Sequence, residues 1–553
     1  MTSSNGPRTG RPPVYAARGM VSSPHYLASE SGMKALRHGG SAVDAAIALN
    51  LTMAVVYSQM AGVGGDGFWL LAGGKVKDVE AIRASGPSAA KATIEYYHKQ
   101  GHTGVIPDRG PLAALTVPGA LDGFRIAHER HGKLDWAELF EDAICYARHG
   151  FAVTRSLADW IVADEHLLNK YPGMAETFLP TGKPQREGSF LAQPKLADTL
   201  ELMAKKGVRE AFYEGELAER ICSGLQPLGS PLAPEDFAAY QAEWVTPITT
   251  NYRGYDIYQL PPSTQGMTAI QVLNLLEGYD VASWGDNTVN YYHHMAEVLK
   301  VAAADRDEWL TDPNFVDIPL GKLLSKSYAD ERRKLIREDR ALPAGEIEPG
   351  MRYGTNFDKP SPSGGTVYFC VTDSDGLMVS KIQSPYYDFG ACVMGGDTGI
   401  IMQNRGSFFS LDEKHPNRLE PKKNTFHTII PALAMKDGTP VIAYGTMGGE
   451  GQSQTQAAML TRMIDFGYDV QQSIEAPRWL FGRTWGMESR DLWMESDVPD
   501  NVLRELIARG QPVKLVGRWD SIVGHAQAIR WNADTGFYEG GADPRGDGCA
   551  LGF

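Results

Sequence analysis

The stretch Gly364-Gly365-Thr366-Val367-Tyr368-Phe369-Cys370-Val371-Thr372-Asp373 joins a glycine pair to a threonine and a strand-like run. The two glycines leave the carbonyl group of Gly365 unshielded and its backbone free to adopt unusual dihedral angles. The hydroxyl of Thr366 comes next and can attack that carbonyl. The pattern predicts that the chain cuts itself between Gly365 and Thr366, although a glycine-rich loop entering an ordinary strand has the same pattern.

Cleavage at this bond would create a catalytic group. Thr366 would become a new N-terminus, whose hydroxyl is a nucleophile and whose own α-amine is a base. That amine titrates at about 7.7 to 8.0, so near neutral pH a useful fraction of it can accept a proton. The β-branched side chain restricts χ1 and helps to hold the hydroxyl in one direction. The alternative is a strand threonine that points at solvent.

Length, composition and charge narrow the class of protein. At 553 residues the chain exceeds what one hydrophobic core usually organises, so we expect two closely packed halves. The hydrophobic content of 43% and the charged content of 22% are those of an ordinary soluble globular protein. The net charge of −14 argues against nucleic acid as a partner, because phosphate binding needs a basic face.

The sequence offers no membrane, metal or nucleotide signal. No run approaches 18 apolar residues, and the N-terminus lacks the apolar segment of a signal peptide. The five cysteines are scattered without metal-ligand spacing and fit reduced thiols, which predicts a cytoplasmic location and no metal. No Lys-Ser/Thr follows the glycine-rich turn 62–67, so it is not a phosphate loop, and we expect no cofactor.

Hydrophobic periodicity divides the chain into segments. Residues 1–17 read as a flexible leader, and a helical pattern starts at Ser29, with Ser41 and Asp44 as an approximate capping box for a second helix. After Thr366 the pattern changes to alternating strands followed by helices, an α+β arrangement in which helices lie over antiparallel sheet, plausibly in four layers. The expected strands are 366–373, 377–384, 399–403, 428–436 and 440–446, with helices near 452–467 and 499–509 and terminal strands near 513–516 and 525–531.

Several ordered blocks resemble the γ-glutamyltransferase family of N-terminal-nucleophile (Ntn) hydrolases. They are the helix motif from Gly39 to Ala46, the turn Gly62-Val63-Gly64-Gly65-Asp66-Gly67-Phe68, the strand Ala81-Ile82-Arg83, the nucleophile strand from Thr366 to Gly376, and the turn Gly445-Thr446-Met447-Gly448-Gly449. The resemblance runs from about residue 18 to the C-terminus. It implies a four-layer αββα sandwich built from two autocleaved subunits, a large one of residues 18–365 and a small one of residues 366–553. These would remain together as an αβ heterodimer, and its further association is left open.

The resemblance also implies roles for individual residues. Thr366 would be the nucleophile in both self-cleavage and turnover, and Ser384 falls where the family places a hydroxyl that hydrogen-bonds it. Gly448 and Gly449 would present backbone N–H groups to the oxyanion of the tetrahedral intermediate. Arg83 would hold a substrate carboxylate through its forked donors. Ser384 could instead simply open the turn before Pro385, the glycine pair could be a plain turn, and Arg83 could be a surface arginine.

Departures from the family pattern indicate the substrate. Members that recognise a glutamyl group carry an acidic residue where this chain has Phe408, and polar amides where it has Arg405 and Tyr386. The paired serines that hold the glutamyl carboxylate align with His427 and Thr428. An added guanidinium, a lost carboxylate and an aromatic wall suit an acyl group that is anionic but lacks an amine. His427 could bind that carboxylate or tune a proton transfer, or it could be structural.

The expected function is therefore hydrolysis of amides of small carboxyl-bearing acids. The pattern Asn404-Arg405-Gly406-Ser407-Phe408-Phe409-Ser410-Leu411-Asp412 looks like the oxamate amidohydrolase branch, with glutaryl-type cephalosporin acylases as the neighbouring possibility. Two alternatives stay open. One is true γ-glutamyl hydrolase or transferase activity, and the other is an unprocessed relative that serves as a binding or scaffold protein.

Overall fold

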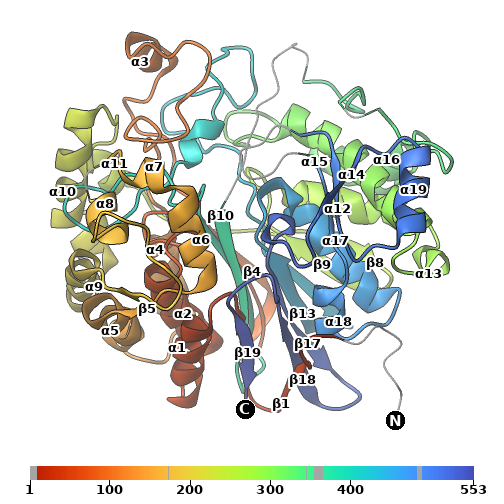
Figure 1. Cartoon of the computed structure of the whole chain (residues 1–553), viewed down its shortest axis with the longest axis horizontal. Coiled ribbons are helices and arrows are strands. Elements are labelled where there is room, and N and C mark those ends of the chain that lie inside the picture. The colour runs from red at the N-terminus through yellow and green to blue at the C-terminus, as the bar shows by residue number, and fades with distance from the viewer. Residues whose placement is uncertain (1–8, 172, 344, 354–364, 483–488) are drawn as a thin grey trace.

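Strand β10 (Gly365–Thr372) lies near the centre of a seven-stranded sheet in the computed structural model of the chain (Figure 1). The structure describes residues 9–553 except 172, 344, 354–364 and 483–488. Every residue of β10 is buried, because side chains alternate between two covered faces. Val367 and Phe369 pack toward helices, whereas Tyr368 and Cys370 pack toward a second sheet.

The two sheets lie face to face. The strand order is β19-β2-β10-β11-β3-β4-β7 in the first sheet and β1-β18-β17-β13-β12-β9-β8 in the second. In the first sheet β10 and β11, which follow the Gly365–Thr366 bond, lie between β2 and β3, which precede it, so the two parts of the chain cannot separate without breaking the sheet. The strands are β1 (Val14–Ala16), β2 (Met20–Ser23), β3 (Asp66–Gly73), β4 (Val76–Ala84), β7 (Glu243–Val245), β8 (Ile248–Tyr252), β9 (Tyr255–Gln259), β11 (Met378–Tyr386), β12 (Ala432–Lys436), β13 (Thr439–Thr446), β17 (Ala526–Asn532), β18 (Phe537–Ala542) and β19 (Cys549–Gly552).

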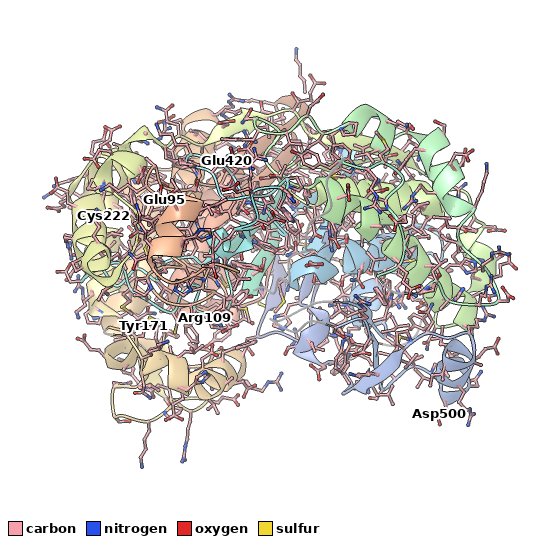
Figure 2. All side chains as sticks on the ribbon, turned by 90° about the horizontal axis from the view of Figure 1, so that it is seen from above. Glu95, Arg109, Tyr171, Cys222, Glu420 and Asp500 are labelled. Atoms are coloured by element: carbon pink, nitrogen blue, oxygen red, sulfur yellow. The ribbon has the colours of Figure 1, made fainter. Side chains whose placement is uncertain are left out.

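Helices cover the outer face of each sheet and complete the four layers (Figure 1). This confirms the expected α+β fold, a four-layer αββα sandwich. Seen from above, Cys222 and Asp500, which belong to the two outer helical layers, lie on opposite sides of the molecule (Figure 2). The first layer contains α1 (Tyr26–Arg37), α2 (Ala42–Val56), α4 (Ala120–His131), α5 (Glu141–His149), α6 (Arg155–Ala163), α9 (Pro194–Lys206) and α10 (Glu216–Leu225), and the second α12 (Gly266–Leu276), α14 (Val289–Trp309), α16 (Lys326–Arg333), α17 (Gln452–Ile464), α18 (Val470–Glu475) and α19 (Asp500–Ala508).

Helix α2 shows how the sequence fixes the first layer. The predicted capping box is present: the Ser41 hydroxyl accepts from the Asp44 N–H, and the Asp44 carboxylate accepts from the Ser41 N–H. All fifteen residues of α2 are buried. A helix that is apolar all round can be stable only inside a protein, and α2 accordingly lies under α1 and against β10 and β11. None of the helices in the described part of the chain combines the length and the apolar character needed to cross a membrane.

Two expectations about secondary structure are wrong. The leader is not free of structure throughout, because Val14–Ala16 form β1 at the edge of the second sheet and Arg11 donates to the carbonyl of Gly548; residues 1–8 lie outside the described part. The expected strand 399–403 is instead irregular chain with one isolated bridge, between Met394 and Ile401. Gly399 interrupts any strand there with a φ of 74°.

A lysine is buried in the core, and no counter-ion pairs with it among the described residues. Lys381 of β11 is fully buried, and its ammonium group lies 4.4 Å from the ring centre of Trp69 and 4.1 Å from that of Phe124. It donates a hydrogen bond to Asn50, but it forms no ion pair with any residue that the structure describes. Burial lowers the pKa of Lys381 well below its usual value. In the unfolded chain the lysine is protonated below pH ~10.4 and must lose that charge or bury it on folding.

Lys381→Met is therefore expected to stabilise the protein at neutral pH. The substitution removes a buried charge, which outweighs the roughly 1 kcal/mol of the lost hydrogen bond to Asn50. The net gain should be on the order of 1 kcal/mol and should shrink as the pH rises toward ~10, where the unfolded lysine also loses its proton. Chemical denaturation at pH 7 and pH 9.5 measures both effects, and a destabilised variant at pH 7 would contradict this interpretation of Lys381.

Candidate active site

Thr366 lies at the start of β10, in a local irregularity of the strand. The pairing of β10 with β11 shifts register between Gly365 and Val367, which leaves Thr366 without a direct cross-strand partner. Such a bulge turns a side chain away from the regular alternation. The Thr366 hydroxyl donates to the Ser384 hydroxyl at 3.2 Å, and only 1% of the Thr366 surface is exposed. The nucleophile expected from the sequence thus lies in a buried polar contact.

Ser384 of β11 contacts both ends of the bond expected to break. Its hydroxyl donates to the carbonyl oxygen of Gly365 at 2.5 Å, and it accepts from Thr366 and from the Tyr386 N–H, the latter at 2.8 Å. Donation to the carbonyl oxygen polarises the carbonyl and stabilises the negative charge that develops when a hydroxyl attacks its carbon. The structure thereby brings together Gly365, Thr366 and Ser384.

Only a glycine fits at position 365. A Cβ atom on Gly365 would lie 2.8 Å from the backbone nitrogen of Asp388 and 3.0 Å from the backbone carbon of Tyr387.

An ionic cluster stabilises the turn that contains Asp388. The guanidinium of Arg109 pairs with the Asp388 carboxylate at 2.6 Å. Burial, followed by the effect of Asp388, raises the pKa of Asp164 to about 9. We did not predict this Arg109–Asp388–Asp164 cluster, because its members are far apart in sequence and match no short motif.

Gly448 and Gly449 form the turn that follows β13. Their φ angles are 127° and 56°, values that favour glycine. Within the described residues, neither N–H donates to a backbone carbonyl or to a side chain. The preceding Gly445 packs over the ring of Tyr368 in β10, and a Cβ added to it would lie 2.5 Å from that ring. We call the segment 447–449 the oxyanion turn, after the role that the resemblance implies for its two free N–H donors.

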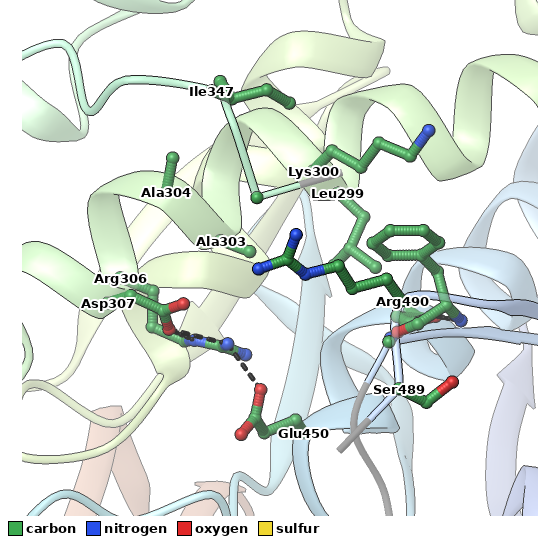
Figure 3. Close-up of a pocket in the computed structure, with 14 residues that line it drawn as sticks. Leu299, Lys300, Ala303, Ala304, Arg306, Asp307, Ile347, Glu450, Ser489 and Arg490 are labelled. Atoms are coloured by element: carbon green, nitrogen blue, oxygen red, sulfur yellow. Dashed lines mark hydrogen bonds and ion pairs between the residues drawn. The ribbon is translucent and has the colours of Figure 1, made fainter. Parts of the chain in front are cut away.

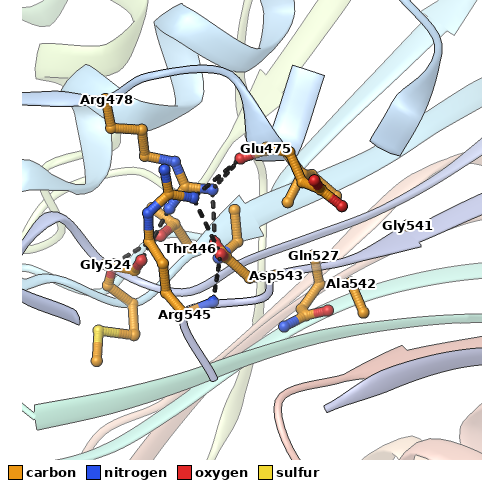
Figure 4. Close-up of polar contacts among 12 residues, drawn as sticks. Thr446, Glu475, Arg478, Gly524, Gln527, Gly541, Ala542, Asp543 and Arg545 are labelled. Atoms are coloured by element: carbon orange, nitrogen blue, oxygen red, sulfur yellow. Dashed lines mark hydrogen bonds and ion pairs between the residues drawn. The ribbon is translucent and has the colours of Figure 1, made fainter. Parts of the chain in front are cut away.

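A buried ionic network supports the oxyanion turn (Figure 4). The backbone N–H of Met447 donates to the carbonyl of His525 at 3.1 Å, and Arg478 donates to the carbonyl of Gly524 at 2.8 Å. Arg478 also pairs with the Asp543 carboxylate at 2.5 Å, and Arg545 pairs with the other oxygen at 3.0 Å. Burial opposes ionisation of Asp543, but the two guanidinium groups hold its pKa at about 2. The network therefore stays charged throughout the physiological range.

Gly524→Ala is expected to lower kcat by about tenfold to 100-fold with little change in KM. A Cβ on Gly524 would lie 2.3 Å from the carbonyl oxygen of Met447, so the alanine displaces the oxyanion turn. Steady-state kinetics measures the effect. Gly536→Ala is the matched control, since Gly536 also has a positive φ, of 69°, but has nothing within 4 Å of an added Cβ. Equal kcat and KM values for the two variants would show that Gly524 has no role in catalysis.

Arg405 is a buried cation beside Ser384. It lies in a short 3₁₀ turn (Arg405–Phe408) and is fully buried. It donates to the Ser384 hydroxyl at 3.3 Å and to the Thr428 hydroxyl at 3.2 Å. Its Nε has no hydrogen-bond partner, and no carboxylate pairs with it, among the residues that the structure describes. Burial lowers the pKa of Arg405 to about 10, so the guanidinium keeps its charge at neutral pH.

Aromatic rings form the wall around Arg405. The guanidinium lies 4.2 Å from the ring centre of Tyr386, which stacks on Phe408 at 4.6 Å. Phe408 in turn contacts Phe426 at 4.7 Å. Tyr386 has a φ of 84°, which is strained for a non-glycine residue and aims its ring at Arg405. A chain of contacts beside Ser384 thus joins four of the residues expected in the substrate pocket, Thr428, Arg405, Tyr386 and Phe408.

His427 makes contacts to Asp66 and to its own loop. Its Nε2 contacts the Asp66 carboxylate at 2.9 Å and its Nδ1 contacts the carbonyl of Thr425 at 2.8 Å, so both ring nitrogens are occupied. The side chain is fully buried, and burial lowers its pKa. The expectation that His427 binds a substrate carboxylate is therefore not supported, and the histidine holds Asp66.

Asp66 is a structural centre that the sequence reasoning missed. Its carboxylate accepts from the backbone N–H groups of Gly86 and Gly119, at 3.1 and 3.0 Å, and from the side chains of Gln403 and His427. The glycine-rich turn 62–67 was recognised as a motif, but its acidic residue was not. The signal for Asp66 in the sequence was a single aspartate between two glycines.

Arg83 lies farther along the same sheet. It is on β4, opposite Phe68 of β3, and its guanidinium pairs with Glu243 of β7 at 2.7 Å. It does not contact Thr366, Ser384 or any other predicted site residue among those described. Because the Glu243 side chain is 57% exposed, this pair is worth little, and a substrate carboxylate could replace Glu243.

Arg83→Ala is expected to leave processing intact and to raise KM with a smaller change in kcat. The arginine would contribute to substrate binding and not to the chemical step. Initial-rate kinetics on the purified variant checks this, with Glu243→Gln as the control that frees Arg83 without removing it. An unchanged KM for Arg83→Ala would mean that Arg83 has only a structural role in the sheet.

No metal centre is present in the described ranges, where no group of three His, Cys, Asp or Glu side chains is close enough to hold an ion.

Comparisons with known proteins match almost the whole chain. The sequence model of the family described as gamma-glutamyltranspeptidase matches residues 28–553. The glutathione hydrolase-like YwrD proenzyme of Bacillus subtilis (strain 168) is 45% identical over 540 residues, which cover 98% of this chain and 99% of that protein. The oxamate amidohydrolase proenzyme of Klebsiella pneumoniae is 40% identical over 543 residues, with 97% and 99% covered.

Solved structures give the same relationship. The cephalosporin acylase from Bacillus halodurans superposes with a TM-score of 0.90 and 34% identity, covering 100% of this chain and 99% of its own. A chain of gamma-glutamyltranspeptidase from Helicobacter pylori superposes with a TM-score of 0.57 and 31% identity. That chain is covered in full, yet it covers only 64% of the present one.

Proposed function

Because the chain belongs to the gamma-glutamyltranspeptidase family of Ntn hydrolases, we propose that it is a self-processing amidohydrolase for small carboxyl-bearing acyl groups. It would cut its own Gly365–Thr366 bond and then hydrolyse amides such as oxamate at the freed threonine. The observation that carries the choice of substrate is Arg405, a fully buried cation without a carboxylate partner in the described structure. Such a charge is costly to bury unless an anion comes to it, and the acyl group of the substrate would supply that anion.

Self-cleavage would follow from the contacts at the bond. The Thr366 hydroxyl attacks the carbonyl carbon of Gly365, and Ser384 donates to the carbonyl oxygen as it becomes negative. The C–N bond then breaks and leaves Gly365 attached as an ester to the Thr366 oxygen. In that step the Thr366 nitrogen takes up the proton and becomes a free amine. Water then hydrolyses the ester, which releases the Gly365 carboxylate and restores the Thr366 hydroxyl. Several relatives carry the word proenzyme in their names, which supports this step.

Turnover would use the same threonine. The α-amine accepts the proton of the Thr366 hydroxyl as the oxygen attacks the amide carbon of the substrate. The N–H groups of Gly448 and Gly449 donate to the resulting oxyanion, while Arg405 holds the carboxylate. The C–N bond breaks, the amine leaves with the proton, and an acyl-threonine ester remains. Water then attacks the ester and releases the acid.

The cleaved parts would form an αβ heterodimer of residues 1–365 and 366–553. Strands β10 and β11 of the second part lie between β2 and β3 of the first part, so the interface is the core of a sheet. The first part would hold 66% of the chain (365 of 553 residues), close to the 64% covered by the Helicobacter pylori chain. Further association and a cytoplasmic location remain predictions.

A γ-glutamyl substrate is the second candidate, because one relative is named glutathione hydrolase-like. Its ammonium group would need a carboxylate near the nucleophile. Phe408 occupies the position that is acidic in glutamyl-recognising members and is 2% exposed. The nearby Asp66 carboxylate already accepts from four donors. These contacts favour an acyl group without an amine.

A substrate panel tests the proposal. Purified, processed protein is assayed for amine release from oxamate, from glutaric monoamide and from a γ-glutamyl anilide, with Thr366→Ala as the inactive control. Oxamate or glutaric monoamide should be hydrolysed at least tenfold more efficiently than the anilide. Preference for the anilide would establish the second candidate, and no release from any of them would overturn both.

A further inference from the structure

Gln265 is a fully buried glutamine that contacts both the oxyanion turn and the pocket around Arg405. Its side-chain Nε2 donates to the carbonyl oxygen of Thr428 at 2.5 Å and to that of Gly449 at 3.0 Å. Carbonyl oxygens only accept hydrogen bonds, so the nitrogen of the amide must face them, and both of its N–H groups are used. The Oε1 atom of Gln265 has no hydrogen-bond partner among the described residues.

The backbone around Gln265 is fixed independently of its side chain. The residue directly precedes helix α12, and its own N–H donates to the carbonyl of His427 at 2.9 Å. The N–H of His427 donates in return to the carbonyl of Ser263 at 2.8 Å. A Cβ added to Gly266 would lie 2.2 Å from the carbonyl oxygen of Leu260, so the start of the helix is closely packed. A substitution at Gln265 therefore removes the side-chain contacts and leaves the segment in place.

The oxyanion turn needs an external support. Gly448 and Gly449 have the widest backbone freedom of any residue type, whereas oxyanion donors lower a barrier only when they are held in place before the reaction. Beyond the turn, Glu450 pairs with Arg306 of α14 at 2.5 Å (Figure 3). The carbonyl of Gly449 itself is held by Gln265. The side chain of Gln265 thus limits the orientation of the second proposed donor.

The other contact of Gln265 leads to the proposed carboxylate site. Thr428 is held twice: its hydroxyl accepts from Arg405 at 3.2 Å, and its carbonyl accepts from Gln265. A continuous path of hydrogen bonds therefore runs from Arg405 through Thr428 and Gln265 to Gly449. Its two ends are the groups that would hold the carboxylate of the substrate and the oxygen of its amide.

We propose that Gln265 is a positioning residue that fixes the spacing between Arg405 and the oxyanion turn, and that it thereby makes the enzyme selective for one length of acyl chain. The inference rests on the proposed function and deepens it. Oxamate has no carbon between its carboxylate and its amide carbon, whereas succinamate has two and glutaric monoamide has three. A fixed spacing places the carboxylate and the amide oxygen on their partners together best for one of these lengths.

Kinetics with this series of monoamides tests the proposal. The wild type should hydrolyse one of the three with a kcat/KM about tenfold or more above the other two. Gln265→Met removes both donors and keeps an unbranched side chain. It should lower kcat for the preferred monoamide by about tenfold or more and change KM less than about threefold, because the substrate still reaches Arg405 while the oxyanion donors are displaced. The preference for one length should fall below about threefold.

Two further variants separate positioning from stability. Gln271→Met is the matched control: Gln271 is buried on the same helix, its Nε2 also donates twice, to Asp305 at 3.1 Å and to the carbonyl of Leu323 at 3.3 Å, and its Oε1 likewise has no described partner. This variant should keep kcat and the preference. Gln265→Glu keeps the shape of the side chain without its two N–H donors, so it should be impaired at least as much as Gln265→Met. Self-cleavage and the thermal midpoint of each variant show whether the fold is retained.

The outcomes separate the inference from the function on which it rests. If the wild type hydrolyses the monoamides without preferring one length, or if Gln265→Met keeps both kcat and the preference, the inference is wrong and the proposed function stands. Equal losses in Gln271→Met, or wild-type kinetics in Gln265→Glu, would leave Gln265 with a packing role alone and would overturn the inference as well. If the wild type hydrolyses none of the three, the proposed function fails and the inference fails with it.

Discussion

Thr366→Ala is expected to yield one uncut chain of 553 residues with no amidohydrolase activity. The substitution removes the hydroxyl that attacks Gly365 and the nucleophile of turnover together, so both reactions should stop. The fold should survive, because Thr366 contributes a single hydrogen bond to Ser384. Denaturing electrophoresis reports cleavage, and an amine-release assay reports turnover. The loss of activity should exceed about 1,000-fold.

Thr366→Ser is the matched control for this variant. Serine keeps the hydroxyl and the future α-amine but lacks the methyl group that restricts χ1, so cleavage and turnover should persist at lower rates. If Thr366→Ala were cut at the same position, or if it retained activity, another residue would have to be the nucleophile.

Arg405→Met is expected to lower kcat/KM for oxamate by about 100-fold while the chain still processes itself. The guanidinium would make charge-assisted hydrogen bonds to the substrate carboxylate, worth roughly 3 kcal/mol together. The fold should tolerate the change, because no described carboxylate pairs with Arg405 and its removal therefore strands no charge there. Steady-state kinetics with oxamate gives the ratio, and denaturing electrophoresis monitors processing.

Arg405→Lys separates charge from geometry, since lysine keeps the charge without the planar fork and should fall between wild type and Arg405→Met. A double variant extends the test to specificity: Arg405→Gln with Phe408→Asp should move preference toward γ-glutamyl substrates. An unchanged kcat/KM for Arg405→Met would contradict the assignment of this pocket.

Local signals in the sequence predicted much of the fold. The capping box of Ser41 and Asp44 and the strand alternation after Thr366 depend on neighbouring residues, and both are confirmed. The predicted strand at 399–403 is wrong. The apolar run there is bounded by glycine, and its backbone groups hydrogen-bond to Gly64 and to other loop residues instead of to a neighbouring strand. β1 was missed because three residues at a sheet edge give almost no periodic signal.

The site was predictable where a motif is contiguous and unpredictable where it depends on distant contacts. The resemblance identified Thr366, Ser384 and Arg405, and the structure brings them together. The pairing of His427 with Asp66 joins residues 361 positions apart, so the sequence could not show that the histidine is already occupied.

N-terminal sequencing of the smaller fragment from an active preparation tests the central claim most directly. The account predicts a chain that begins Thr366-Val367-Tyr368-Phe369, released without any added protease. An active protein whose Gly365–Thr366 bond remains intact, or whose second fragment begins at another residue, would contradict it.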